Sequence, residues 1–269
     1  MQLLAEERRS FILDQLHAHG KVRVTLLAEQ LQVSQETVRR DLFLLEEEGK
    51  LKRVYGGGVK PQYEGGEPPY QQRTVMNFEA KQAIGMKAVE LVQDGSTIYM
   101  DTGTTIYEMA KALKGKKRIT VITNSLTVAI QLCDSFVKGV LNGRAILLGG
   151  EISPYQQSVN GYLCQEMLKN FYVDHAFISL GGISIDSGIG DYDLNDSVIS
   201  KMVMNMAKQI IVLADHSKVG IQATCHIAPL DKVDVIVCDK PYPSLWEQEL
   251  ERKGITWITA DGKTGEIKS

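Results

Sequence analysis

The sequence predicts an α/β protein with a small helical domain followed by a larger domain built on a mainly parallel sheet. Before residue 60, apolar residues recur at helical spacing and give way to alternating basic and apolar residues before a glycine turn. From Phe78 onward, near-continuous apolar strands alternate with helices, as expected of a parallel sheet covered on both faces. We therefore divide the chain into a first domain (1–60), a linker rich in Gly and Pro (61–75) and a second domain (76–269).

The stretch from Ser34 to Leu45 predicts one amphipathic helix. Val38, Leu42 and Leu45 recur at helical spacing and give it a buried side, and the Ser34 hydroxyl can cap its N-terminus. Its other faces carry Gln35, Glu36, Thr37, Arg39 and Arg40. Amides and guanidiniums on exposed first turns can read base edges and hold phosphate. A solvated surface helix is the competing interpretation, and this stretch alone does not decide between the two.

The segments before this helix favour DNA binding. A helix over 8–19 should end at Gly20, and Thr25 should cap a second, shorter helix. The connection at 32–34 has about the length that a helix-turn-helix uses. Two helices joined in this way place the second one where it can enter a DNA groove.

The segment after the helix predicts a wing. We expect the helix to span 34–48, followed by alternating basic and apolar residues at 50–55 and a glycine turn at 56–58. This pattern indicates a strand and a wing, with DNA contacts from Lys52, Arg53 and Tyr55. The first domain is therefore expected to be a winged helix-turn-helix that binds DNA.

Charge and hydropathy narrow the class of protein. A net charge of −3 over 269 residues argues against a protein that coats DNA regardless of sequence, because such proteins are strongly basic. DNA contact must come from a local basic cluster, which the first domain supplies as Lys21, Arg23, Arg39, Arg40, Lys50, Lys52, Arg53 and Lys60. No apolar run approaches the roughly 20 residues of a membrane span, and the N-terminal residues lack the pattern of a signal peptide. We expect a cytoplasmic protein without a membrane partner.

The cysteines give no sign of a metal site. Cys133, Cys164, Cys225 and Cys238 are widely spaced, and no pair has the spacing of zinc ligands. Cys133 and Cys238 lie in apolar stretches and are interpreted as small core residues. Neither a metal ion nor a cofactor is expected.

A candidate anion site follows the first strand of the second domain. The strand at 97–100 is followed by Asp101, Gly103, Thr104 and Thr105. Glycine lets a ligand approach the backbone, the threonines add hydroxyls, and the N-terminus of the next helix adds free amides, a combination that holds phosphate. Because ligands of parallel sheets bind beyond the carboxyl ends of the strands, a phosphate site is expected here.

Similar residues recur at other strand ends. We assign to the same site Thr123, Asn124, Ser125, Gly149, Gly150, Gly181, Gly182, Asp215 and Lys218. Lys218 can place an ammonium group against the anion. Any one of these loops can be a plain turn or a helix cap, but their repetition along one sheet favours a shared ligand site.

Three separated pieces of the first domain agree in order and spacing with a known family. They are Arg9…Ile12…Leu16, then Ser34-x-x-Thr37-Val38-Arg39-Arg40-Asp41-Leu42, then Leu51-x-Arg53-Val54-Tyr55-Gly56-Gly57. On these residues the chain resembles the DeoR family of bacterial transcriptional regulators. The resemblance implies that helix 34–48 enters the major groove of operator DNA and that the wing touches the DNA backbone or minor groove.

The resemblance extends to the second domain. The loops at 101–105, 123–125, 149–150, 181–183 and 215–220 look like those of the DeoR-type effector domain. That domain is similar in fold to sugar-phosphate isomerases such as ribose-5-phosphate isomerase, and the resemblance implies that it senses a phosphorylated sugar. The chain departs from the family after Gly188, where it reads Ile-Gly-Asp-Tyr-Asp instead of a hydroxyl residue and an acidic pair. The sugar end of the pocket is therefore expected to differ in shape.

Three functions can be set against these observations. The favoured one is a ligand-controlled transcription factor, a repressor of a sugar-catabolic operon. It should act as a dimer or tetramer, because one winged helix alone buries too little DNA surface to be selective. An isomerase-like enzyme acting on a sugar phosphate is the alternative. It would have to use Asp101, Asp215 and Lys218, and the sequence shows no nucleophile–base pair or metal set beside them. A nucleotide-binding protein is disfavoured, since no strand is followed by a glycine-rich dinucleotide or P-loop motif.

Overall fold

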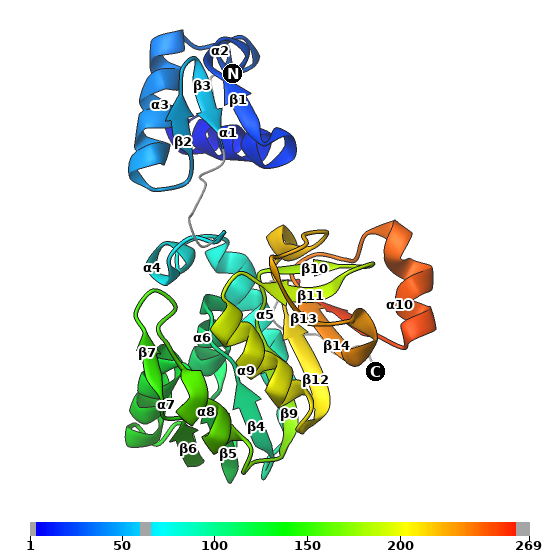
Figure 1. The fold of residues 1–269 in the computed structure, drawn as a ribbon. Helices are drawn as coiled ribbons and strands as arrows, with labels where there is room; N and C mark the ends of the chain where they lie inside the picture. Colours follow the sequence, from blue (N-terminus) through cyan, green and yellow to red (C-terminus); the bar gives the residue numbers. More distant parts are fainter. Residues whose placement is uncertain (1–3, 60–65, 262–269) are drawn as a thin grey trace. The chain divides into compact units, whose positions relative to one another are not determined.

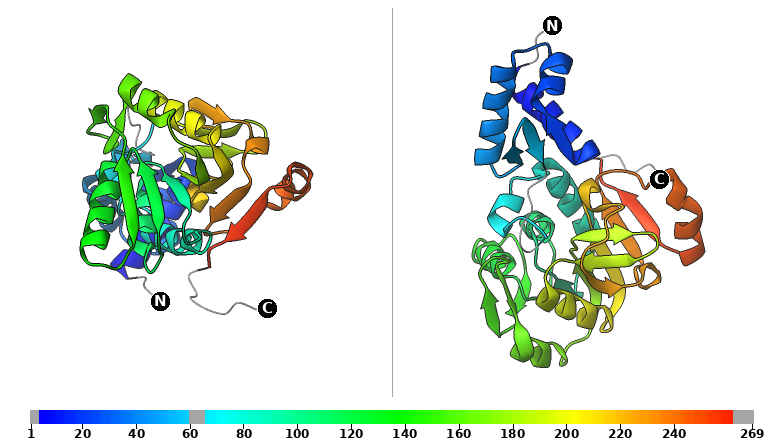
Figure 2. Two further views of the ribbon diagram at one scale, coloured as in Figure 1. Left: turned by 90° about the horizontal axis from the view of Figure 1, so that it is seen from below. Right: turned by 45° about the horizontal axis from the view of Figure 1, so that its top comes forward.

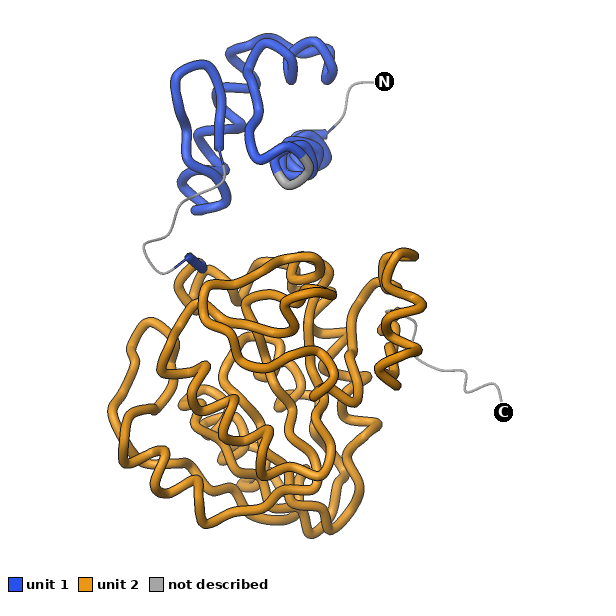
Figure 3. The backbone as a smooth tube through the Cα atoms, turned by 45° about the vertical axis from the view of Figure 1, so that its right-hand side comes forward, with its two compact units in different colours: residues 1–67 blue, residues 68–269 orange. Residues whose placement is uncertain are grey.

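The computed structural model describes residues 4–59 and 66–261, which belong to two compact units (Figure 3). The first unit is Met1–Glu67 and the second is Pro68–Ser269. The boundary falls inside the expected linker at 61–75. Residues 60–65 lie outside the described residues, whereas Tyr70–Arg73 forms helix α4 at the start of the second unit. Each unit is described by itself.

The first unit combines helices with a small antiparallel sheet (Figure 1). Its elements are α1 (Ala5–His19), β1 (Lys21–Arg23), α2 (Val24–Leu31), α3 (Gln35–Glu47), β2 (Lys52–Val54) and β3 (Gly57–Val59). The strands are hydrogen-bonded in the order β1-β3-β2. Val38, Leu42 and Leu45 of α3 are buried in one core with Ile12 and Leu16 of α1. The expected winged helix-turn-helix is confirmed.

The helix ends of the first unit match the expected caps in two of three cases. The Ser34 hydroxyl accepts from the Thr37 amide at 3.1 Å, and Gly20 ends α1 with a φ of 72°. The cap assigned to Thr25 is wrong, because α2 begins one residue earlier and Arg23 precedes it without a side-chain cap. The wing supplies a partner instead, since the Val24 amide donates to the Gly56 carbonyl at 2.9 Å.

A buried ion pair joins α1 to α3. The Arg8 guanidinium donates through Nε to Asp41 Oδ2 at 2.5 Å and through Nη2 to Asp41 Oδ1 at 3.0 Å. The hydrogen bond to Asp41 raises the pKa of Arg8. This two-pronged geometry fixes the tilt of α3 against α1.

The second unit alternates helices and strands (Figure 1). Its helices are α4 (Tyr70–Arg73), α5 (Phe78–Glu90), α6 (Thr104–Ala112), α7 (Leu126–Val137), α8 (Gly161–Leu168), α9 (Leu194–Met204) and α10 (Glu247–Lys253), with short 3-10 turns η1 (His216–Lys218), η2 (Leu230–Lys232) and η3 (Ser244–Trp246). Its strands are β4 (Thr97–Met100), β5 (Ile119–Thr123), β6 (Gly143–Leu147), β7 (Glu151–Ser153), β8 (Ser158–Asn160), β9 (Val173–Ile178), β10 (Gly182–Ser184), β11 (Gly188–Asp191), β12 (Ala207–Leu213), β13 (Cys225–Ala228), β14 (Val235–Cys238) and β15 (Thr256–Thr259).

A seven-stranded parallel sheet forms the centre of the second unit, in the order β15-β14-β12-β9-β4-β5-β6. Successive residues of each strand point to opposite faces. Ile98 and Met100 of β4 therefore join a core with α5, α6 and α7, whereas Tyr99 joins a core with α8 and α9. Helices cover both faces (Figure 2), and the expected parallel α/β domain is confirmed.

The strand order reverses at the middle of this sheet. From β4 the chain proceeds to β5 and β6 on one side, and to β9, β12, β14 and β15 on the other. The reversal lies between β4 and β9. In open parallel sheets, the crevice outside the carboxyl ends at such a reversal is where ligands bind.

Two smaller β structures were not expected from the sequence. The antiparallel pair β7–β8 and the sheet β10-β11-β13 consist of strands of three or four residues. Runs this short show no measurable alternation of apolar and polar residues. The interpretation of Cys133 as a core residue is also wrong, since it is exposed on α7, while Cys238 is buried as expected.

Helices α5 and α6 cross at very close range. A Cβ added to Gly85 of α5 would lie 2.6 Å from the backbone nitrogen of Met109 on α6. Real Cβ atoms do not approach other atoms so closely, so only glycine fits here. The crossing fixes α6 beneath α5.

Candidate functional site

The face of the first unit formed by α3 and the wing carries a groove. A cavity of about 570 Å³ lies there, lined by Val24, Thr25, Gln35, Arg39, Leu42, Arg53, Val54, Tyr55, Gly56 and Gly57. Gln35, Arg39, Arg53 and Tyr55 were expected to contact DNA, and the structure brings all four to this one groove. Its walls are the start of the third helix and the tip of the wing, the two elements that a winged helix presents to DNA.

The polar residues of α3 divide into two groups. Ser34 and Thr37 bond to each other at the helix start, with 2.9 Å between their hydroxyl oxygens. Arg39 and Arg40 are exposed, and Arg39 donates to Glu36 Oε2 at 3.2 Å and to Gln35 Oε1 at 3.4 Å. Glu36 and Gln35 therefore hold Arg39 in position along the helix surface.

The wing is fastened to α3 by Arg53. Its Nε donates to Glu46 Oε2 at 2.6 Å, its backbone amide donates to Glu46 Oε1 at 2.7 Å, and its guanidinium lies 5.1 Å from the centre of the Phe43 ring. The side-chain hydrogen bond from Arg53 lowers the pKa of Glu46. Arg53 thus sets the angle between wing and helix, while Lys52 and the fully exposed Tyr55 stay open to solvent.

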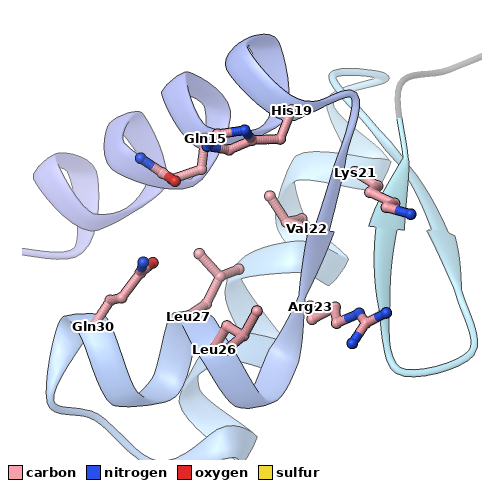
Figure 4. Close-up of a pocket in the computed structure, with 8 residues that line it drawn as sticks. All are labelled: Gln15, His19, Lys21, Val22, Arg23, Leu26, Leu27 and Gln30. Atoms are coloured by element: carbon pink, nitrogen blue, oxygen red, sulfur yellow. The ribbon is translucent and has the colours of Figure 1, made fainter.

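A second cavity of the first unit lies away from α3. It has a volume of about 340 Å³ and is lined by Gln15, His19, Lys21, Val22, Arg23, Leu26, Leu27 and Gln30, from α1, β1 and α2 (Figure 4). None of these residues belongs to the third helix. The groove between α3 and the wing is therefore the better candidate for DNA.

Asp101 forms a buried junction at the sheet reversal of the second unit. Its side chain is 2% exposed and accepts from the Thr102 amide at 2.9 Å, the Ser200 hydroxyl at 3.0 Å and the Ser179 amide at 3.3 Å. These bonds join the loop after β4 to the loop after β9 and to α9. Burial raises the pKa of Asp101 to about 8. The carboxyl group therefore ties loops together around the crevice.

The glycine expected at this site closes the same two loops onto each other. Gly103 has a φ of 126°, and a Cβ there would lie 2.6 Å from the Ser179 hydroxyl. That hydroxyl donates to the Thr102 carbonyl at 2.5 Å. Helix α6 starts at Thr104 without a side-chain cap. Thr104 and Thr105, the first residues of this helix, are both buried.

The loop after β5 is used by the fold itself. The Ser125 hydroxyl caps α7 by accepting from the Val128 amide at 3.3 Å, and Thr123 Oγ1 accepts from the Ser125 amide at 3.0 Å. Asn124 accepts from the Tyr99 hydroxyl at 2.7 Å. All three loop residues are fully buried. Their hydrogen bonds fix the conformation of the loop between β5 and α7.

The hairpin β7–β8 and helix α9 add polar groups that the sequence interpretation missed. Asp196 Oδ1 accepts from the Ser158 hydroxyl at 3.0 Å and from the Asn160 side-chain amide at 3.4 Å. Burial raises the pKa of Asp196 to about 6. One sequence signal could have pointed to these groups. Asp193 caps α9 and lies in the stretch where the sequence departs from the family pattern.

The glycine pairs have separate structural roles. Gly150 directly precedes β7, and a Cβ there would lie 2.3 Å from the Asn160 carbonyl oxygen, whereas Gly149 has open space around it. Gly182 starts β10, and a Cβ there would lie 2.5 Å from the Ile221 carbonyl oxygen. Gly181 lies against Tyr192. Gly150, Gly181 and Gly182 therefore allow close packing of neighbouring segments, whereas Gly149 is not required for it.

Asp215 and Lys218 follow β12, beyond β9 as seen from β4. Asp215 Oδ1 accepts from the Ser217 backbone amide at 3.0 Å and from the Asn77 side-chain amide at 2.9 Å. Among residues 4–59 and 66–261, no recorded hydrogen bond joins Asp215 to the β4 loop. Asp101, Gly103 and Thr104 follow one another in the loop after β4, at the reversal, whereas Asp215 caps η1 further along the same edge.

The described residues contain neither a metal-binding cluster nor a membrane-spanning helix. Over 4–59 and 66–261, no three His, Cys, Asp or Glu side chains are grouped so that they could hold a metal ion. The helices in those ranges are all too short or too polar to cross a membrane.

Two family models match the chain in tandem. A model described as the DeoR-like helix-turn-helix domain matches residues 8–62, and one described as the DeoR C terminal sensor domain matches residues 76–240. The transcriptional regulator GolR of Listeria innocua is 32% identical over 233 residues, which cover 87% of this chain and 90% of that protein. The transcriptional repressor GlcR of Bacillus subtilis is 33% identical over 260 residues, which cover 97% of this chain and 98% of that protein.

Solved structures give weaker matches. Ribose 5-phosphate isomerase A of Methanocaldococcus jannaschii is 18% identical, with a TM-score of 0.37 and coverage of 53% of this chain and 55% of that one. The full-length sorbitol operon regulator SorC of Klebsiella pneumoniae is 12% identical, with a TM-score of 0.34 and coverage of 78% and 90%. Scores this low carry no argument about function.

Proposed function

We propose that the chain, which belongs to the DeoR family of DNA-binding transcriptional regulators, represses a sugar-catabolic operon under the control of a phosphorylated sugar. Both domains of the family match in order, and the relatives are named as regulators or repressors, not as enzymes. The protein is accordingly a transcriptional regulator. The operator-binding face, the class of ligand and the assembly are the finer parts of the proposal.

The DNA-binding part rests on the groove between α3 and the wing. We assign base reading to Gln35, Glu36, Thr37 and Arg39, and phosphate contact to Arg40, Lys52 and Tyr55. Ser34 and Arg53 would position these groups through the helix cap and the Glu46 pair. Arg40 is exposed, and a guanidinium on this helix face suits a phosphate oxygen.

A mobility-shift titration with the DNA upstream of the chain's own gene tests this part. The wild-type protein should retard the fragment at moderate salt, and Arg40→Ala should weaken binding by about tenfold or more and reduce the salt slope by about 1. Arg252→Ala, on α10 of the second unit, is the matched control and should bind like the wild type. An Arg40→Ala variant that binds normally would remove α3 from the interface.

The ligand part rests on one observation, the uncapped start of α6 at the sheet reversal beside Gly103 and Ser179. Free amides at a helix N-terminus attract anions, and a reversal point is where parallel sheets bind ligands. We assign phosphate binding to Gly103, Thr104 and Thr105. Asp101, Thr123, Asn124 and Ser125 would hold the loops, while Gly149, Gly150, Gly181, Gly182, Asp215 and Lys218 would border the sugar end.

A thermal-shift screen tests the class of ligand. Ribose 5-phosphate, glucose 6-phosphate and fructose 6-phosphate are compared with the unphosphorylated sugars at equal ionic strength. At least one phosphorylated sugar should raise the melting temperature, and Thr104→Val should lose the response while Thr256→Val on β15 keeps it. Stabilisation by the plain sugars alone would contradict a phosphate site.

The assembly follows from the proposed target. A single winged helix covers too few base pairs to be selective, so we propose a dimer or tetramer that places paired winged helices on repeated half-sites. A regulator that acts on operator DNA is expected to work in the cytoplasm. Light scattering of the purified chain gives its mass, and a monomer that still binds one operator tightly would contradict the assembly.

A further inference from the structure

Helix α4, the first element of the second unit, is bonded to the loops of the candidate ligand site. The Tyr70 hydroxyl lies 2.8 Å from Thr127 Oγ1, which in turn lies 3.1 Å from the Ser125 hydroxyl. The Tyr70 amide donates to the Tyr155 carbonyl, in the turn between β7 and β8, at 3.1 Å. The start of α4 therefore contacts the first turn of α7 and the turn of the β7–β8 hairpin (Figure 1).

The other end of α4 reaches the β4 loop through one glutamine. Arg73 Nη2 donates to Gln156 Oε1. The Gln156 carbonyl accepts from Thr102 Oγ1 at 3.3 Å, and Thr102 directly precedes Gly103. The Arg73 guanidinium is thus linked through Gln156 to the loop in which the uncapped helix begins.

The charges of the neighbouring groups favour a cation at the position of Arg73. The ionisable side chains hydrogen-bonded into this crevice include the carboxyl groups of Asp101 and Asp196, which would repel a phosphate if ionised. Burial raises the pKa of Asp196, and the charge of Arg73 opposes that shift. A planar guanidinium can hold two phosphate oxygens at once, which a lysine cannot do.

The backbone of Arg73 is held while its side chain can change partners. Lys81 of α5 donates to the Arg73 carbonyl at 2.5 Å and is itself buried. Gln156 is a neutral partner, and an anion is a stronger one for a guanidinium. A phosphate at the start of α6 would therefore compete with Gln156 for Arg73, and the hairpin turn would lose its bond to α4.

We propose that Arg73 binds the phosphate of the effector, and that α4 thereby passes the occupancy of the site to the chain segment that leads to the DNA-binding unit. This assignment rests on the proposed function. It adds to that function a cation that binds the phosphate and a path from the ligand site to the DNA-binding unit. Pro68 and Pro69 stiffen the segment just before α4.

Binding is tested on the full-length protein with inorganic phosphate and with ribose 5-phosphate, glucose 6-phosphate and fructose 6-phosphate. The melting temperature is measured against ligand concentration at constant ionic strength. Arg73→Gln should raise the half-saturating concentration at least about tenfold, and Arg73→Lys should fall between Gln and the wild type because it keeps the charge but not the fork. Arg252→Gln is the matched control and should respond like the wild type.

Coupling is tested with Tyr70→Phe, which removes only the hydroxyl bonded to Thr127. This variant should bind the same phosphorylated probe within about twofold of the wild type, because its phosphate ligands are intact. The probe should nevertheless change its DNA affinity less than it changes that of the wild type in a mobility-shift assay. A Tyr70→Phe variant that couples like the wild type would overturn the route through α4.

The outcomes separate this inference from the proposed function. If the wild type responds to a phosphorylated probe and Arg73→Gln responds equally, the role of Arg73 is overturned and the effector site stands. If the wild type responds to no phosphorylated probe, the effector site and the role of Arg73 are both overturned. Should Arg73→Gln melt early without ligand, the graded loss in a stably folded Arg73→Lys decides the question.

Discussion

Gly103 shows how much one residue determines at the ligand site. Its φ of 126° and the 2.6 Å that would separate a Cβ from the Ser179 hydroxyl leave no room for any other side chain. The sequence predicted a glycine that a ligand approaches. The structure gives this glycine a second role, because it also lets the loops after β4 and β9 meet.

Gly103→Ala should destabilise the second unit by about 2 kcal/mol, since backbone strain and displacement of Ser179 add together. The first unit should keep its DNA affinity without ligand, while stabilisation by phosphorylated sugars is lost. Gly115→Ala is the control, because Gly115 also has a positive φ, of 73°, but nothing within 4 Å of its added Cβ. If Gly103→Ala and Gly115→Ala lost the same free energy of unfolding in urea, the close approach of Gly103 to Ser179 would be unimportant.

Asp101 gives the second unit a pH dependence. Its pKa of about 8 in the folded state lies above the ordinary value of 3.8, so the folded state binds a proton that the unfolded state releases between these values. The resulting stability is complete below about pH 4 and is lost as the pH rises through 8.

Asp101→Asn should therefore unfold at a urea concentration that depends less on pH between 6 and 8 than in the wild type. The variant is expected to be less stable overall, because its amide cannot accept from both the Thr102 and Ser179 amides. Urea midpoints at several pH values check this. Parallel curves for the two proteins would contradict the assignment of the titration to Asp101.

At the scale of elements, helix α3 combines features that the sequence revealed with one that it concealed. The Ser34 cap and the apolar stripe of Val38, Leu42 and Leu45 follow from local spacing and were predicted. The partner of Asp41 could not be predicted, because Arg8 is 33 residues away and only the packing of α1 on α3 brings them together.

Arg8→Leu should lower the stability of the first unit by about 3 kcal/mol, because it leaves the Asp41 carboxylate buried without its partner. The double variant Arg8→Leu/Asp41→Leu should recover most of the loss, since both charges are then removed. Urea unfolding of the three proteins completes the comparison. A double variant no more stable than Arg8→Leu would mean that α1 and α3 depend on the ion pair for their relative geometry.

The sequence was limited in the same way at the candidate ligand site: local structure could be predicted, but pairing between distant segments could not. The strands of the large sheet were predicted from their apolar runs, and so was the loop from Asp101 to Thr105. The pairing of that loop with Ser179, Ser200 and the β7–β8 hairpin joins segments 50 to 100 residues apart, as in the bond of Gln156 to Thr102 across 54 residues and of Ser200 to Asp101 across 99. No local pattern encodes such pairings, so the sequence predicted the loop itself but not the segments that bond to it.

At the scale of the whole molecule, the chain consists of two units with separate hydrophobic cores. The core of the first unit contains residues from Ile12 to Leu51, and the cores of the second unit begin at Ala83. No core cluster of the described residues contains members of both units. Each unit therefore has the means to unfold on its own.

Scanning calorimetry of the full chain should resolve two transitions. A phosphorylated sugar that binds the second unit should raise the temperature of one transition and leave the other within about 1 °C, because a ligand stabilises only the state that binds it. Operator DNA should act on the other transition. A single transition shifted by both ligands would show that the units unfold cooperatively.

The crossing at Gly85 bears on how a signal can leave the ligand site. With the α5 backbone pressed against Met109, helix α6 cannot slide along its axis or roll without pushing its neighbour aside. If α6 binds the anion as proposed, it is therefore the element that stays in place, and the displacement on binding is expected in the β7–β8 turn and α4.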